Sequence, residues 1–148
     1  MNVVYNICKE LAKEGHEVSV YTTNAFDEKR NFKLERQEYT YHGFKVRYFQ
    51  NVLRPGKLYI SPGMVSACRK EITNFDIIHL HAYRQFQEII TYHYAKKHHV
   101  PYVLHLHGTL PWRTAKKELK LIYNMFFGNR ILRDASKVFA LSPIEAQQ

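Results

Sequence analysis

The sequence contains little of what stabilises small secreted proteins or crosses a membrane. Its two cysteines, Cys8 and Cys68, are far apart and have no Cys-x-x-Cys spacing, so neither a disulfide framework nor a zinc knuckle is indicated. The longest uninterrupted apolar runs are a few residues, far short of the roughly 20 that cross a bilayer. The N-terminus also lacks the hydrophobic core of a signal peptide. These absences predict a cytoplasmic protein, soluble or peripheral at the inner membrane face.

Acidic residues are outnumbered by basic ones. The chain has 22 Lys and Arg against 13 Asp and Glu, a formal net charge of +9. This excess favours anionic partners such as phosphorylated substrates or acidic lipid surfaces. No recognisable nucleic-acid module is present, so we do not expect nucleic acid to be the partner. With 148 residues, 45% of them hydrophobic, the chain is long enough for one domain with a sizeable core.

The most informative stretch is residues 76–111. Two short apolar runs, 76–81 and 102–107, each end in His-x-His, and an amphipathic stretch of helical length separates them. A helical crossover of this length joins parallel strands with a right-handed connection. Ligands of open parallel sheets bind outside the carboxyl ends of the strands. We therefore expect a site where the two His-x-His ends meet.

The rest of the chain alternates between helical and strand patterns, which predicts an α/β fold with a parallel sheet. The apolar middle of the last long helix, residues 121–127, indicates deep burial or a partner. The first predicted elements are a helix over 3–14, with Val4, Ile7, Cys8 and Leu11 as its apolar stripe, and a strand over 16–24. Residues 39–41 and 44–49 could form a hairpin or a strand pair, with His42 as a turn residue. A loop over 52–63, a helix over 64–73, a helix over 114–133 and a buried strand over 137–142 complete the pattern.

Four stretches together resemble a known family. VVYNICKELAKEGHEVSVYTTN, NFDIIHLHA, VPYVLHLHGT and ASKVFALSPIE are similar, in order and spacing, to the N-terminal domain of glycosyltransferase family 4 enzymes of the GT-B fold. The resemblance implies a Rossmann-like three-layer sandwich with a mostly parallel sheet, and a single acceptor-side domain over residues 1–148. It implies a retaining hexosyltransferase that moves a sugar from a nucleotide-sugar to a cell-surface glycan or glycolipid acceptor.

Two parts of the family pattern are missing from this chain. The first helix begins almost at residue 1, so we expect a strand and a glycine-rich loop to precede Met1. The second domain of the family, which binds the nucleotide-sugar and carries a Glu-x7-Glu type motif, has no counterpart here. We therefore expect the chain alone to be inactive. The resemblance implies no cofactor, because the nucleotide-sugar is a co-substrate.

The resemblance also assigns the candidate site. It maps His107 onto a histidine that lies beside the transferred sugar, where an imidazole can hydrogen-bond a hydroxyl and stabilise an oxocarbenium-like transition state. The other candidates come from the residues themselves. His81, at the other strand end, should reach the same cleft, Gly108 and Thr109 could offer a backbone N–H and a hydroxyl to substrate, and Arg113 could meet a phosphate. A simple turn at Gly108 and Thr109, and a solvated charge at Arg113, remain the alternatives. The inner histidines, His79 and His105, are expected in the core.

Two other readings stay open. The His-x-His pairs could converge on a divalent ion, as in metal-dependent hydrolases, but no Asp or Glu closely follows His81 or His107, so we expect no metal site. The chain could instead be a non-catalytic basic module that binds anionic lipid or glycan, against the alternative of a buried helix with a solvated basic edge. The basic residues that flank the apolar segment 121–127 are Lys116, Lys117, Lys120, Arg130 and Arg133.

Overall fold

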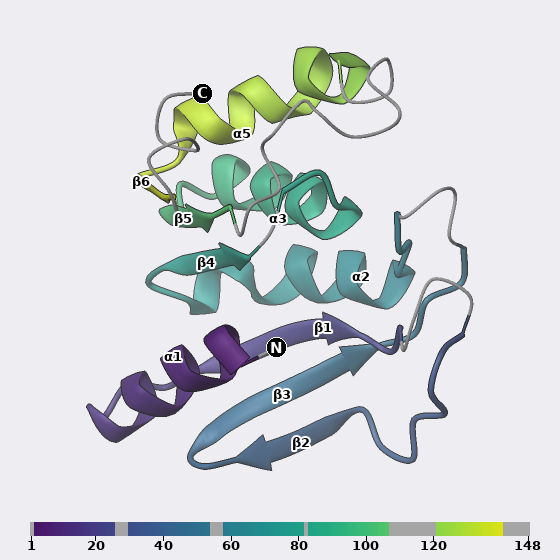
Figure 1. Ribbon diagram of the computed structural model, residues 1–148, viewed down its shortest axis with the longest axis vertical. Coiled ribbons are helices and arrows are strands. Elements are labelled where there is room, and N and C mark those ends of the chain that lie inside the picture. The colour runs from purple at the N-terminus through teal and green to yellow at the C-terminus, as the bar shows by residue number, and fades with distance from the viewer. Residues whose placement is uncertain (1, 26–29, 54–57, 82, 107–120, 141–148) are drawn as a thin grey trace. The chain divides into compact units, whose positions relative to one another are not determined.

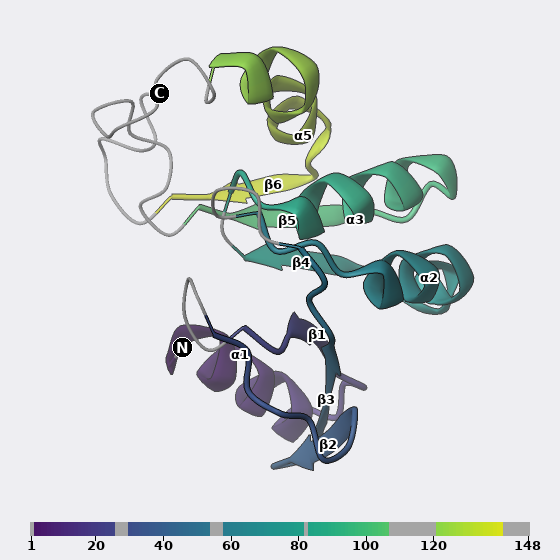
Figure 2. The same cartoon turned by 90° about the vertical axis from the view of Figure 1, so that its right-hand side faces the viewer.

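The computed structural model describes residues 2–25, 30–53, 58–81, 83–106 and 121–140. The chain forms two compact units, residues 1–64 and 65–148, shown in two views in Figures 1 and 2. Each unit combines helices with a three-stranded sheet that contains parallel pairing. The predicted α/β, Rossmann-like class is confirmed. Single-domain organisation stays a prediction.

In the first unit, helix α1 (Asn2–Lys13) packs on a sheet. Its Cys8 is buried with Phe44 and Val46. The helix ends as predicted at Gly15, whose φ of +89° is readily adopted by glycine. The predicted apolar stripe is one residue too long, because Leu11 is 40% exposed. The buried face therefore covers only the first part of the stripe.

The sheet of this unit has the strand order β1-β3-β2. Strand β1 (Ser19–Thr23) runs parallel to β3 (Phe44–Phe49), and β2 (Glu38–Tyr41) pairs with β3 as an antiparallel hairpin. His42 and Gly43 form the turn with φ values of 44° and 88°. Two consecutive positive φ values match the twist of a tight hairpin. The predicted hairpin and the turn role of His42 are confirmed.

Helix α2 (Pro62–Glu71) corrects one prediction. Pro62 and Gly63 were expected to close a loop, but they form the first turn of the helix. A proline fits there because the first helical N–H has no partner within the helix and its φ is already helical. A short 3-10 turn, η1 (Ile72–Asn74), follows.

The second sheet is entirely parallel, with the order β4-β5-β6. Its strands are β4 (Ile78–His81), β5 (Tyr102–His105) and β6 (Lys137–Phe139), and helix α3 (Phe86–Lys97) connects the first two. Figure 2 shows the three strands as neighbours with α3 beside them. The core below them includes Leu80, Leu104 and Ile131. The strand, helix, strand unit expected from the sequence is thus confirmed as parallel.

Strand β6 is less buried than predicted. Val138 is 41% exposed and Phe139 is 47% exposed, although their apolar run is typical of a buried strand. Within the described residues, β6 pairs with β5 alone and is an edge strand. Hydrophobicity does not distinguish an edge strand from a central one, which explains the error.

The helical segment before β6 is irregular. After helical residues 121–123, a π-helical turn η2 (Asn124–Gly128) leads into α5 (Asn129–Asp134). Of the two alternatives expected for the apolar stretch, deep burial or a partner, deep burial does not hold for most of its side chains. Five of its side chains are 41% to 62% exposed: Leu121, Ile122, Met125, Phe126 and Phe127.

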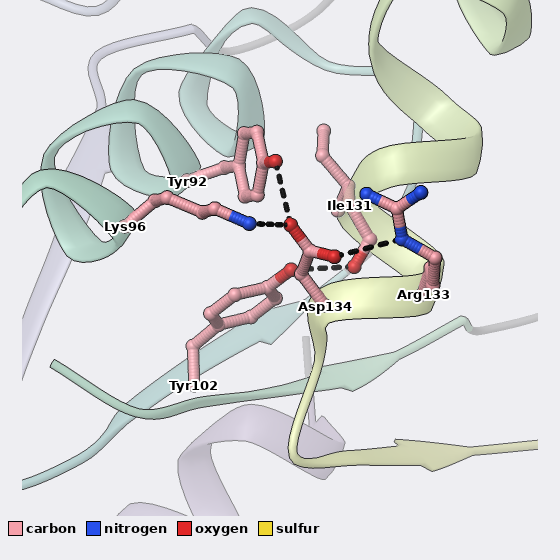
Figure 3. Close-up of polar contacts among 6 residues, drawn as sticks. All are labelled: Tyr92, Lys96, Tyr102, Ile131, Arg133 and Asp134. Carbon is pink, nitrogen blue, oxygen red and sulfur yellow. Dashed lines mark hydrogen bonds and ion pairs between the residues drawn. The ribbon is translucent and has the colours of Figure 1, made fainter. Parts of the chain in front are cut away.

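Helix α5 is held on α3 by polar contacts around Asp134 (Figure 3). The Asp134 carboxylate accepts a hydrogen bond from the Tyr92 hydroxyl at 2.9 Å and forms ion pairs with Lys96 and, at 3.0 Å, with Arg133 Nε. Hydrogen bonds from Lys96, Arg133 and Tyr92 hold the pKa of Asp134 well below its ordinary value. This network connects α3 to α5, and its residues Lys96 and Asp134 are 38 positions apart in the sequence.

Candidate functional site

The register of β4 and β5 brings the histidines of the second unit together. His81 on β4 pairs with His105 on β5, and His79 lies two residues before His81. Side chains two residues apart project from the same face of a strand. The intervening Leu80, and Leu104 on β5, are buried in the core. The apolar positions therefore face the core, and the three histidines share the other face.

The three imidazole rings form one cluster, which we call the histidine cluster. The rings of His79 and His81 are stacked with centroids 4.0 Å apart, and His105 lies 5.8 Å from His79 and 5.7 Å from His81. One ligating atom from each residue lies within 4.8 Å of the other two. All three residues are half-buried. The sequence predicted a core position for His79 and His105, and the structure places both beside His81 as half-buried residues, with His79 Nε2 and His105 Nδ1 themselves buried.

Of the predicted site residues, the structure describes His81 alone. It is the last residue of β4, at the carboxyl end where the site was expected. The other four, His107, Gly108, Thr109 and Arg113, lie outside the described residues. Their roles stay predictions.

A comparison with protein families decides what this arrangement belongs to. The family model described as Glycosyltransferase Family 4 matches residues 2–148. The chain belongs to glycosyltransferase family 4. No curated protein matches the chain. Membership makes it a transferase domain that works on sugar-containing substrates, and it confirms the resemblance seen in the sequence.

In this family 4 domain, the segment after β4 builds a second polar cluster. The Tyr83 hydroxyl donates a hydrogen bond to Asn124 Oδ1 at 3.2 Å, and Arg84 Nε donates to the same oxygen at 3.4 Å. The Arg84 guanidinium also lies 4.8 Å from the centre of the Tyr83 ring. Burial raises the pKa of Tyr83 to about 12, so the phenol remains protonated and can donate at neutral pH.

Glu88 is a buried carboxyl group next to this cluster. Its side chain caps the first turn of α3 by accepting a hydrogen bond from the Gln85 backbone N–H at 2.7 Å. Only 2% of the residue is exposed. Desolvation raises the pKa of Glu88 to about 8, although hydrogen bonds from the Gln85 and Arg84 backbone oppose the shift. The family 4 domain therefore holds this side chain mostly as a neutral carboxylic acid at pH 7.

The π-helical turn η2 supplies the other side of this cluster. Asn124 is buried in it, and Gly128 faces the Tyr83 hydroxyl so closely that an added Cβ would clash with that oxygen and lie 2.7 Å from Asn124 Oδ1. Single π-turns within helices are frequent at functional sites. Sequence reasoning missed this cluster, because Tyr83 and Asn124 are 41 residues apart. The available signal was Gln85-x-x-Glu88, which has the spacing of a capping box.

The described part of the family 4 domain thus offers two sets of polar groups around β4. The histidine cluster supplies ring nitrogens at the carboxyl ends of β4 and β5. The second cluster supplies a phenol, a guanidinium and a neutral carboxylic acid directly after β4. The half-buried imidazoles and the Arg84 guanidinium can donate hydrogen bonds to sugar hydroxyls or to a phosphate. Tyr83 and Glu88 are each 2% exposed, so they support the segment after β4 from the interior.

Proposed function

We propose that this chain is the acceptor-side domain of a retaining hexosyltransferase that moves a sugar from a nucleotide-sugar to a cell-surface glycan or glycolipid. The family match over residues 2–148 carries the proposal. The parallel pairing of β4 and β5 supports it, because it directs His81 and His105 to the sheet edge where ligands of such sheets bind. In this proposal the nucleotide-sugar is bound mainly by the C-terminal domain of a two-domain enzyme.

In this proposal His107 is the catalytic residue. Its imidazole hydrogen-bonds a hydroxyl of the transferred sugar and stabilises positive charge as the transition state develops. His81, Gly108, Thr109 and Arg113 bind substrate, and Arg113 is suited to a phosphate group. Leaving-group charge is neutralised by a basic side chain of the C-terminal domain, so the transfer requires no metal ion.

Binding experiments test the acceptor-side assignment. Isothermal titration of the chain with lipid-linked glycans, free glycans and nucleotide-sugars should give micromolar to millimolar affinity for an acceptor and none for a nucleotide-sugar. Tight binding of a nucleotide-sugar without any acceptor binding would overturn the assignment.

The role of His107 is tested in a transfer assay that includes the nucleotide-sugar domain. Replacing His107 by Ala should lower kcat by roughly a hundredfold, the usual cost of removing one transition-state hydrogen bond. His93→Ala is a matched control because His93 is exposed on α3. Equal activity of the two variants would contradict the catalytic role.

A separate observation supports peripheral attachment to an anionic membrane surface at the inner face. The apolar patch consists of Leu121, Ile122, Met125, Phe126 and Phe127, all at least 41% exposed. Arg130 is exposed directly after it. An apolar surface next to cationic side chains fits the interface of an anionic bilayer. Among the described residues, no helix has the length and apolar character of a bilayer span.

Vesicle flotation tests the attachment. Binding to phosphatidylglycerol vesicles should exceed binding to phosphatidylcholine vesicles, and Phe126→Ser should reduce it severalfold. Phe32→Ser is the matched control, because Phe32 is a partly exposed aromatic of the first unit, 36% exposed. Equal loss in both variants, or no preference for the anionic vesicles, would contradict attachment through the patch.

A further inference from the structure

We propose that the histidine cluster, His79, His81 and His105, is a binding site for a divalent transition-metal ion, with Zn²⁺ as the best fit. Neither the family match nor the proposed sugar transfer assigns such a site. The sequence led us to expect no metal site, because no carboxylate closely follows His81 or His107, but the structure brings three imidazoles together without needing one. Among the described residues, this is the one group of at least three His, Cys, Asp or Glu side chains placed to hold a metal ion.

The geometry of the cluster follows from the sheet. Two histidines of β4 with i, i+2 spacing and one cross-strand partner on β5 supply three donors on one face. The donor atoms lie within 4.8 Å of one another. In a tetrahedral zinc site with bonds of about 2.0–2.1 Å, the nitrogens are roughly 3.3 Å apart. Small rotations of the imidazoles close this gap, because the outer torsion of histidine has a broad energy minimum.

The chemistry of the donors selects the class of ion. Neutral imidazole nitrogens suit Zn²⁺, Cu²⁺, Ni²⁺ and Co²⁺, whereas Mg²⁺ and Ca²⁺ require oxygen ligands. The cluster contains no carboxylate or thiolate. Three protein nitrogens leave the fourth position of a tetrahedral ion open to water or to an oxygen of a bound molecule.

The surroundings favour a defined site. The Phe139 ring of β6 lies 5.9 Å from the His79 ring and 5.7 Å from the His105 ring. An apolar neighbour of a metal site influences its solvent access and local dielectric. The rigid strands also fix the ligand backbones before the ion arrives. Binding should therefore stabilise the second unit through β4 and β5 without any catalytic role for the ion.

Zinc titration tests the proposal. The chain, stripped of metal by a chelator and dialysed, is titrated with zinc chloride in competition with a chromophoric chelator. We expect one zinc ion per chain. His79→Gln, His81→Gln and His105→Gln should each weaken binding by roughly tenfold or more, since each removes a direct ligand. His93→Gln, an exposed histidine on α3, should bind as the unchanged chain does.

Two further measurements on the unchanged chain keep the proposal testable if a variant does not fold. Co²⁺ should give the visible absorption of a tetrahedral ion with nitrogen ligands, without the thiolate band that Cys8 or Cys68 would produce. Zinc should raise the Tm, since a ligand that binds only the folded state stabilises it. Absence of stoichiometric zinc, a thiolate band, or equal affinity in all four variants would overturn the proposal. The failure is distinguishable from that of sugar transfer, because no readout measures activity.

Discussion

Two residues near the end of β4 show how strongly single side chains depend on their surroundings. Glu88 and Gly128 lie on different helical segments. Glu88 is close enough to Tyr83 to act on it electrostatically, and Gly128 borders both Tyr83 and Asn124. The Glu88 carboxyl group is shielded from bulk water, and Gly128 has no room for a methyl group. Each therefore supports a prediction about stability.

Replacing Glu88 by Gln should flatten the pH dependence of stability. The folded state raises the pKa of Glu88 from 4.5 to about 8. The folded chain is therefore most stable, as far as this group is concerned, at a pH below 4.5, where Glu88 is protonated in both the folded and the unfolded state. The free energy of unfolding should then fall as the pH rises from about 5 to about 8, at up to about 1.4 kcal/mol per pH unit. The neutral Gln keeps an oxygen for the Gln85 N–H and removes this loss.

Urea unfolding at several pH values measures the effect. The difference between the unchanged chain and Glu88→Gln isolates this group from the nine histidines, which titrate in the same range. Glu38→Gln, at an exposed position of β2, serves as the control. Parallel pH profiles for all three proteins would show that Glu88 is ionised in the folded state.

Replacing Gly128 by Ala should destabilise the chain, although alanine is the better helix former. The new Cβ would clash with the Tyr83 hydroxyl and lie 2.7 Å from Asn124 Oδ1. Overpacking of this kind costs about 1–3 kcal/mol. Asn129→Ala, the exposed next residue, should be neutral or slightly stabilising. Thermal unfolding compares the two, and a higher Tm for Gly128→Ala than for the unchanged chain would contradict the crowding.

At the scale of elements, α5 depends on contacts that the sequence does not reveal. Tyr102 of β5 donates a buried hydrogen bond of 2.5 Å to the Ile131 carbonyl oxygen, and Asp134 binds side chains of α3. These contacts connect a six-residue helix to the sheet and to its neighbouring helix. A helix of that length is not stable in isolation.

Replacing Asp134 by Asn should loosen α5. The variant loses the charge that pairs with Lys96 and Arg133, and we expect the free energy of unfolding at neutral pH to fall by about 1–2 kcal/mol. Because the folded state lowers the pKa of Asp134, this contribution exists above its unfolded pKa of 3.8 and disappears as the pH falls further. Urea unfolding at neutral and acidic pH measures it.

Asp76→Asn is the matched control, since Asp76 is exposed before β4. It should change stability by less than about 0.5 kcal/mol. A difference between the Asp134 variant and the unchanged chain that persists in strong acid would point to packing rather than charge.

At the scale of the whole molecule, the net charge of +9 should govern encounters with anionic surfaces. Attraction between exposed charges is screened over about 10 Å at 0.1 M salt and about 3 Å at 1 M. Sedimentation with phosphatidylglycerol vesicles should therefore show binding that weakens steeply as salt is added. The binding contributed by the apolar patch should persist at high salt. Binding that salt does not weaken would contradict the electrostatic contribution, and binding that Phe126→Ser does not reduce would contradict the contribution of the patch.

The histidine positions show how far sequence reasoning reached. His-x-His at the ends of two apolar runs separated by a helical stretch correctly predicted parallel strands and placed His81 at a carboxyl end. It expected His79 and His105 in the core, and did not predict that both are only half-buried. Strand periodicity gives the shared face, but whether that face is covered depends on residues elsewhere in the chain.

The sequence by itself determined the α/β class, most helices and strands, and membership of glycosyltransferase family 4, because these follow from local periodicity and from ordered motifs. Tertiary structure decided which apolar runs are exposed, as in β6 and the apolar patch. It also decided that Tyr83, Glu88 and Asn124 share a buried cluster. Burial and strand pairing bring together residues that are distant in the sequence, so local sequence patterns cannot predict these contacts.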